Sequence, residues 1–194
     1  MSFQNQRIIP AAKTISQVDC AFSSPFEYVV LLETHISQLR PLKREAERVG
    51  KKLIIHADLI NGLKTDNFAA DFLCNEIQPD GIISTRSNMI MKAKERGILA
   101  IQRVFLIDTI ALEKSYSLIE KNAPDYIELL PGIIPEMIQE VYERTKIPVI
   151  TGGLIRHAEE IERALDAGAV AVTTSDKKLW RKFQNNIDDS RDSI

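Results

Sequence analysis

Short apolar runs alternate with amphipathic segments along this chain, and the alternation predicts a repeated strand–helix order. Within the runs, polar and apolar residues do not alternate strictly, which is typical of parallel strands that are covered on both faces. The expected strands are Arg7–Ala12, Tyr28–Leu32, Lys52–Ala57, Ile82–Ser84, Ile98–Leu106, Tyr126–Leu130, Ile147–Ile150 and Ala169–Val172.

Segments with apolar residues at helical spacing separate these strands, and several of them end at a glycine. Gly50, Gly97 and Gly168 are natural stops of this kind. The expected helices are Lys13–Phe22, Leu39–Val49, Asn67–Ile77, Asn88–Arg96, Thr109–Lys121, Pro135–Thr145, Arg156–Ala167 and Asp176–Phe183.

Eight strand–helix pairs in 194 residues predict an α/β protein, a (β/α)8 TIM-like barrel near the small end of its size range. We expect residues 1–183 to form this single domain and the polar residues 184–194 to form a disordered tail. No linker and no shift in composition indicates a second domain. A doubly wound open sheet is the alternative architecture.

Composition narrows the class of protein further. Hydrophobic residues make up 44% of the chain and charged residues 27%, while the net charge of -2 gives no global basic excess for nucleic acid or membrane. Cys20 and Cys74 stand in no metal or redox spacing, and no apolar run is long enough to span a membrane. We therefore expect a cytoplasmic protein with two free thiols.

The last two expected strands both end in residues suited to binding phosphate. Gly152 and Gly153 follow one strand, and Thr174 and Ser175 follow the next. Glycines let backbone N–H groups approach an anion, and the loops after strands seven and eight often form the phosphate site of such a barrel. Arg156 either adds positive charge or is a solvated helix residue. The alternative is tight turns, with Ser175 or Asp176 capping the last helix.

Polar residues also follow the other strands, at the end of a barrel where ligands bind. Arginines there suit anion contacts, but their ion pairing with the carboxylates inside the mouth explains the same pattern equally well. The candidates for contact with the rest of the ligand are Glu33, His56, Asp58, Arg86, Arg103 and Glu128.

Catalysis and metal binding are alternative uses of the same residues. His56 and Asp58 can form an acid–base pair or belong to a metal site, although a structural histidine is more common. The carboxylates can hold Mg²⁺, but no histidine or cysteine spacing supports zinc, and we expect no metal. We find no lysine at the C-terminal end of an expected strand, which counts against a Schiff-base aldolase.

A stripe of basic residues at helical spacing is the candidate for contact with RNA. It consists of Arg40, Arg44, Arg48 and Lys51. A solvated helix face explains such a stripe as well, and the chain has no RNA-recognition signature and no run of aromatic residues for stacking. Charge and pattern alone therefore do not indicate RNA.

Several segments together resemble one family, the glycerol-3-phosphate-responsive antiterminators of the bacterial glycerol uptake operon. The resemblance runs from about Ile8 to Trp180. The segments are IIPAAK, LLETHISQL, HADLINGLKTD, GIISTRSNMIMKAK, IQRVFLIDT, DYIELLPGIIP, TGGLIR and AVTTSDKKLW.

The resemblance implies a barrel that binds glycerol 3-phosphate as its effector and acts on the leader mRNA of glycerol-utilisation genes to prevent premature termination of transcription. It implies a regulator rather than an enzyme and no required cofactor, and it leaves a homo-oligomer open. The contrasting hypothesis is a phosphosugar- or glycerophosphodiester-processing barrel in which His56, with Asp58 or Glu128, performs acid–base catalysis.

Overall fold

Eight parallel strands close into a barrel, which confirms the expected fold. The computed structural model describes residue 3 and residues 6–188, with the backbone alone for residues 185–188. Around the barrel the strands follow the order β1-β10-β9-β8-β7-β6-β4-β2. Their bounds are β1 (Ile8–Ala12), β2 (Tyr28–Leu31), β4 (Lys52–His56), β6 (Gly81–Ser84), β7 (Leu99–Phe105), β8 (Tyr126–Leu130), β9 (Val149–Gly152) and β10 (Ala171–Thr174).

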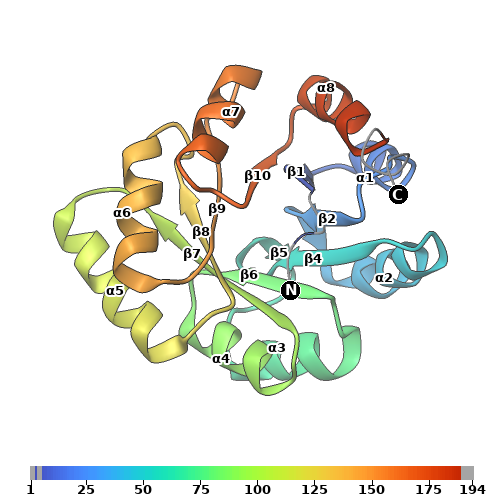
Figure 1. Ribbon diagram of the computed structural model, residues 1–194. Coiled ribbons are helices and arrows are strands. Elements are labelled where there is room, and N and C mark those ends of the chain that lie inside the picture. The colour runs from blue at the N-terminus through green and yellow to red at the C-terminus, as the bar shows by residue number, and fades with distance from the viewer. Residues whose placement is uncertain (1–2, 4–5, 189–194) are drawn as a thin grey trace.

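Helices surround the strands on the outside of the barrel (Figure 1). The arrowheads of β7 and β8 point toward the top of that view, so the C-terminal ends of the strands, the barrel mouth, lie at the top. The helices are α1 (Ile15–Phe22), α2 (Leu39–Arg48), α3 (Asn67–Phe72), α4 (Ser87–Glu95), α5 (Thr109–Asn122), α6 (Pro135–Thr145), α7 (Ala158–Asp166) and α8 (Lys177–Asp188).

A second, two-stranded parallel sheet was not expected from the sequence. It consists of β3 (Thr34–His35) and β5 (Ile60–Asn61). These strands come shortly after β2 and β4, so the small sheet lies on the mouth side of the barrel. Two-residue strands are too short to show a periodicity in the sequence.

Several boundaries differ from the prediction. The helix expected over Asn67–Ile77 is α3 followed by a π-helical turn, Leu73–Ile77. The last helix, α8, reaches Asp188, so residues 184–188 are helical rather than part of a disordered tail. Residues 189–194 of the expected tail lie outside the described residues.

The core has two apolar layers, because successive strand residues point to opposite faces. Ile55 packs in the outer layer, between strands and helices, whereas its neighbour Ile54 packs in the inner layer that fills the barrel. Phe3 closes the inner layer at the N-terminal ends of the strands, where its ring lies 5.0 Å from that of Tyr28 and 4.7 Å from that of Tyr126.

Above the inner apolar layer, the barrel interior becomes polar. The Arg103 guanidinium on β7 donates from Nε and Nη2 to Oε2 of Glu128 on β8, with both distances 2.7 Å. Oε1 of Glu128 accepts a 2.9 Å hydrogen bond from the Thr173 hydroxyl on β10. The side chains of Arg103 and Glu128 are only 9% and 1% exposed, so the pair is shielded from water. The expectation that an arginine pairs with a carboxylate in the mouth is confirmed for this pair.

Removal of one member of this pair should destabilise the protein strongly. We expect Glu128→Leu to lower the free energy of unfolding by about 3–5 kcal/mol, because it leaves the Arg103 charge buried without its partner. The double variant Arg103→Met, Glu128→Leu should recover most of that loss, since it buries no charge. Urea unfolding monitored by circular dichroism measures both values.

Glu113→Gln is the matched control, because Glu113 pairs with Arg144 on the surface, where both side chains are half-exposed. The control should unfold at nearly the urea concentration of the unmodified protein. Equal effects of Glu113→Gln and Glu128→Leu would contradict the role given to the buried pair.

Candidate functional site at the barrel mouth

A cavity of about 300 Å³ opens at the C-terminal ends of the strands. Residues from the ends of β1, β2 and β7–β10 line it, together with Leu59. The register pairs Thr173 of β10 with Gly152 of β9, so the loops that follow these two strands are neighbours. The expectation that the two loops are neighbours is therefore confirmed. Phosphate binding between them stays a prediction.

Gly152 and Gly153 have different parts in this arrangement. A Cβ atom on Gly152 would lie 2.1 Å from Oγ1 of Thr173, so only glycine lets β9 and β10 pack this closely. Gly152 is buried and does not line the cavity. Gly153 does line it, with a left-handed φ of 75°, and Leu154 follows with a φ of 60°.

Three backbone N–H groups of residues that line the cavity are unpaired within the described part of the chain. The carbonyl oxygens of Gly152 and Gly153 accept from the amide of Gly132, at 2.6 and 3.2 Å. Within the described residues, the N–H groups of Gly153, Leu154 and Ser175 have no acceptor. Unpaired amides from two adjacent loops are the arrangement that binds phosphate in many proteins.

The start of α8 lies beside Ser175 and is capped by an aspartate. Oδ1 of Asp176 accepts from the amide of Lys178 at 2.7 Å, and the Thr174 hydroxyl accepts from the amide of Asp176 at 3.2 Å. Asp176 is thus the residue that caps the helix, as the alternative interpretation expected. The Ser175 hydroxyl has no partner among the described residues, and a helix N-terminus favours an anion nearby.

Lys13 is a cavity residue that the sequence analysis missed. We placed it inside a helix, but the Thr14 hydroxyl accepts from the amide of Gln17 and caps α1, so Lys13 directly follows β1. Its ammonium group forms no ion pair with the described residues. The statement that no lysine stands at a strand end was therefore wrong. Thr14 as an N-cap signal could have corrected it.

The other predicted ligand contacts are divided between the cavity and its surroundings. Glu33 and Arg103 line the cavity. Arg86 and Arg156 are exposed and do not line it. The backbone amide of Arg156 donates to Glu160 at 2.6 Å, at the start of α7.

Asp58 connects two strand ends. Its Oδ2 accepts from the amide and the hydroxyl of Thr85 at 2.7 and 2.8 Å, and its Oδ1 accepts from the Ser84 hydroxyl. Both carboxylate oxygens are therefore used within the protein. Asp58 is not hydrogen-bonded to His56, so the acid–base pair that the sequence left open as an alternative does not form.

His56 lies inside the barrel and is 2% exposed. Burial, and after it the Arg103 charge, lower the pKa of its imidazole to about 4, although the Asp58 charge opposes both effects. His56 is therefore neutral at pH 7. Neither ring nitrogen has a hydrogen-bond partner among the described residues.

Three of the four residues of the predicted RNA stripe are engaged by contacts within the protein. Arg40 pairs with Glu76 at 2.7 Å, and Arg48 pairs with Glu45 at 2.6 Å. Lys51, the last residue of the stripe, donates to the carbonyl oxygens of Ser24 and Phe26. Arg44 is exposed and forms no ion pair with the described residues.

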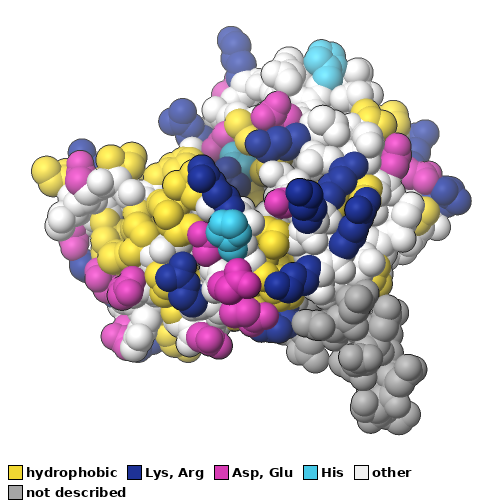
Figure 2. Space-filling model, turned by 90° about the horizontal axis from the view of Figure 1, so that it is seen from above, with side chains coloured by type: hydrophobic (Ala, Val, Ile, Leu, Met, Phe, Trp, Pro, Cys, Tyr) yellow, Lys and Arg dark blue, Asp and Glu magenta, His cyan; other side chains and the backbone are white. Residues whose placement is uncertain are grey.

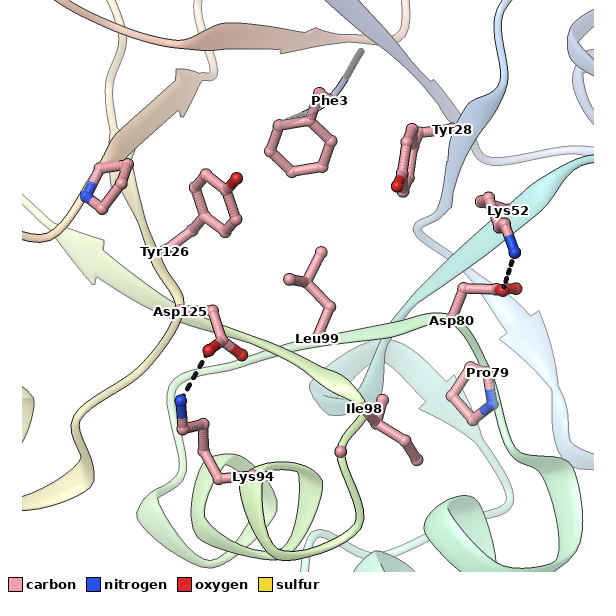
Figure 3. Close-up of a pocket in the computed structure, with 12 residues that line it drawn as sticks. Phe3, Tyr28, Lys52, Pro79, Asp80, Lys94, Ile98, Leu99, Asp125 and Tyr126 are labelled. Carbon is pink, nitrogen blue, oxygen red and sulfur yellow. Dashed lines mark hydrogen bonds and ion pairs between the residues drawn. The ribbon is translucent and has the colours of Figure 1, made fainter. Parts of the chain in front are cut away.

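A larger cavity, of about 680 Å³, lies at the opposite end of the barrel. Figure 3 shows Phe3 between Tyr28 and Tyr126, with charged residues at the edge. These charges are paired, Lys52 with Asp80 at 3.4 Å and Lys94 with Asp125 at 2.6 Å. In barrels of this type the N-terminal end serves stability and the mouth carries ligand sites, so the smaller cavity is the candidate.

The described residues contain neither a cluster of metal-binding side chains nor a helix that could span a membrane. No group of three or more histidine, cysteine, aspartate or glutamate side chains there can hold a metal ion. No helix in that part of the chain is long and apolar enough to cross a bilayer.

Solved structures similar to this chain include two that are described as glycerol uptake operon antiterminator proteins or relatives of them. The glycerol uptake operon antiterminator regulatory protein of Listeria monocytogenes has 53% sequence identity and a TM-score of 0.91, over 93% of this chain and 98% of that one. A glycerol uptake operon antiterminator-related protein of Thermotoga maritima has 28% identity and a TM-score of 0.79, over 91% and 98% of the two chains.

More distant structural neighbours share the fold alone. A deoxyribose phosphate aldolase of Aeropyrum pernix has 17% identity and a TM-score of 0.69, over 96% of this chain and 90% of that one.

Among curated proteins, the uncharacterized protein YgcP of Escherichia coli is 31% identical over 173 residues, which cover 89% of this chain and 91% of that one.

The family model described as glycerol-3-phosphate responsive antiterminator matches residues 8–180, nearly the whole barrel. That match agrees with the two antiterminator structures and with the family expected from the sequence. The chain therefore belongs to the glycerol-3-phosphate responsive antiterminator family.

Proposed function

We propose that this protein binds glycerol 3-phosphate in the mouth cavity, and that the bound form acts on the leader mRNA of glycerol-utilisation genes. The observation that carries the proposal is that Gly153, Leu154 and Ser175 line one small cavity and that their amides have no acceptor among the described residues. The family is responsive to glycerol 3-phosphate, which supports this ligand.

The phosphate would accept from these amides and from the Ser175 hydroxyl. The Lys13 ammonium lines the same cavity without a carboxylate partner among the described residues, so it can balance the charge of the dianion. Glu33, which follows β2 and lines the same cavity, would accept from a ligand hydroxyl, because a carboxylate is an acceptor for hydroxyl donors.

We propose that the protein is a sensor of its ligand and not an enzyme. Glu128 is held by Arg103 and Thr173, and Asp58 is held by Ser84 and Thr85. Both carboxylates already accept hydrogen bonds within the protein, so neither can take a proton from a substrate without giving up one of these contacts. We expect the purified protein to leave glycerophosphodiesters and phosphosugars unchanged.

For the RNA contact, α8 is better suited than the stripe on α2. Lys178 and Arg181 are exposed on α8 and form no ion pair with the described residues. Figure 2 shows the mouth face, with lysine and arginine side chains gathered on the side where Figure 1 draws α1 and α8. Because α8 begins next to Ser175, an effector bound there would lie beside the cations that contact RNA.

The phosphate site is tested by placing a negative charge in it. Gly153→Asp should weaken glycerol 3-phosphate binding at least tenfold, because the new carboxylate repels the dianion at close range. Isothermal titration calorimetry measures the affinity.

Gly50→Asp is the matched control for backbone strain. Gly50 has a φ of 70°, close to the 75° of Gly153, and it follows α2 at the far end of the barrel. This variant should bind as the unmodified protein does. Equal affinities of both variants would contradict a phosphate site at the mouth. If the unmodified protein does not bind glycerol 3-phosphate, this compound is not its effector.

The RNA contact is tested by charge reversal in a gel-shift assay with leader RNA. The double variant Lys178→Glu, Arg181→Glu should bind RNA at least tenfold more weakly near 0.1 M salt. Its plot of log affinity against log salt should be shallower by about 1.4, as expected for two lost phosphate contacts on single-stranded RNA.

Arg44→Glu is the comparison variant on α2 and should retain RNA binding. The reverse result, loss with Arg44→Glu alone, would favour the stripe predicted from the sequence. RNA binding that does not depend on glycerol 3-phosphate would contradict the proposed coupling.

A further inference from the structure

The direction of the His56 side chain follows from its strand. On β4, Ile54 belongs to the inner layer that fills the barrel, and Ile55 belongs to the outer layer under the helices. The alternation along a strand therefore directs His56 into the barrel. Because His56 is the last residue of β4, its ring lies at the top of the interior, beneath the mouth.

The hydrogen-bonding capacity of His56 is unused by the protein. Its side chain is almost fully buried, yet neither Nδ1 nor Nε2 has a partner among the described residues. Most buried polar atoms in proteins are paired, so two unpaired nitrogens on one ring call for a partner that the described residues do not supply. A neutral imidazole offers one donor and one acceptor, the same combination that an alcohol hydroxyl offers.

The charged groups around His56 are already held by other contacts. Both oxygens of Asp58 are held by Ser84 and Thr85, and Glu128 neutralises Arg103. Arg103 uses Nε and Nη2 for Glu128, and its Nη1 has no partner among the described residues. Arg103 also lines the mouth cavity, whereas the buried His56 lies beneath the lining residues and is not one of them.

We propose that His56, with the free Nη1 of Arg103, binds an uncharged hydroxyl of the ligand below its phosphate. This inference rests on the proposed function and adds a specificity determinant to it. The amides and Lys13 would recognise any phosphate monoester, whereas His56 selects one that carries a hydroxyl. The substrate class of the mouth is then a short phosphorylated polyol rather than a phosphate ester in general.

The test compares two ligands that differ only in their hydroxyls, glycerol 3-phosphate and propyl phosphate, by calorimetry. The unmodified protein should prefer glycerol 3-phosphate at least tenfold. His56→Phe should reduce the preference to about twofold or less by weakening glycerol 3-phosphate alone, and His56→Gln, which keeps a donor and an acceptor, should restore part of it.

The exposed His35 on β3 provides the matched control, and His35→Phe should keep the full preference. A merely structural role of His56 would weaken both ligands equally in His56→Phe and leave the preference unchanged, which would overturn the proposal. Equal affinity of the unmodified protein for both ligands would also overturn it while leaving the phosphate site intact. Binding of neither ligand would overturn the proposed function as well.

A second readout uses the unmodified protein and so does not depend on the folding of a variant. In ¹⁵N NMR spectra, the ring nitrogens of His56 should shift on addition of glycerol 3-phosphate and stay in place on addition of propyl phosphate. Identical spectra with the two ligands would contradict a hydroxyl contact at the ring.

Discussion

The ion pair between Arg103 and Glu128 is the interaction on which the interior of the mouth depends. It places a charged pair where a small barrel would otherwise continue its apolar filling, and Thr173 extends the contact to a third strand. Shielded from water, the pair holds its members in fixed positions. Arg103 also lines the cavity, and its charge acts on the buried His56, for which we propose a contact with the ligand.

A second constraint positions the loops above that pair. The absence of a side chain at Gly152 lets β9 and β10 approach, and the amide of Gly132 fixes the carbonyl groups at the end of β9. The amides of Gly153 and Leu154 are then left for another acceptor. Phosphate affinity and polyol selectivity can thus come from separate parts of one cavity, the loops above and the strand interior below.

Much of the fold could be predicted from the sequence, because eight apolar runs separated by amphipathic helices leave few ways to bury both faces of a parallel sheet. The adjacency of the Gly153 and Ser175 loops followed from the same order. Lys13 was missed because it lies between β1 and α1, and the sequence pattern does not fix the boundary between a strand and a helix to within one or two residues. The use of Asp58 within the protein depended on Ser84 and Thr85, whose direction a linear pattern does not give.

A crystal structure of the protein grown with glycerol 3-phosphate tests the central claim most directly. The expected result is a phosphate group within hydrogen-bonding distance of the amides of Gly153, Leu154 and Ser175, with its glycerol hydroxyls directed to His56. A phosphate bound in the cavity around Phe3 and Tyr126, or a mouth without ligand at saturating concentration, would contradict it.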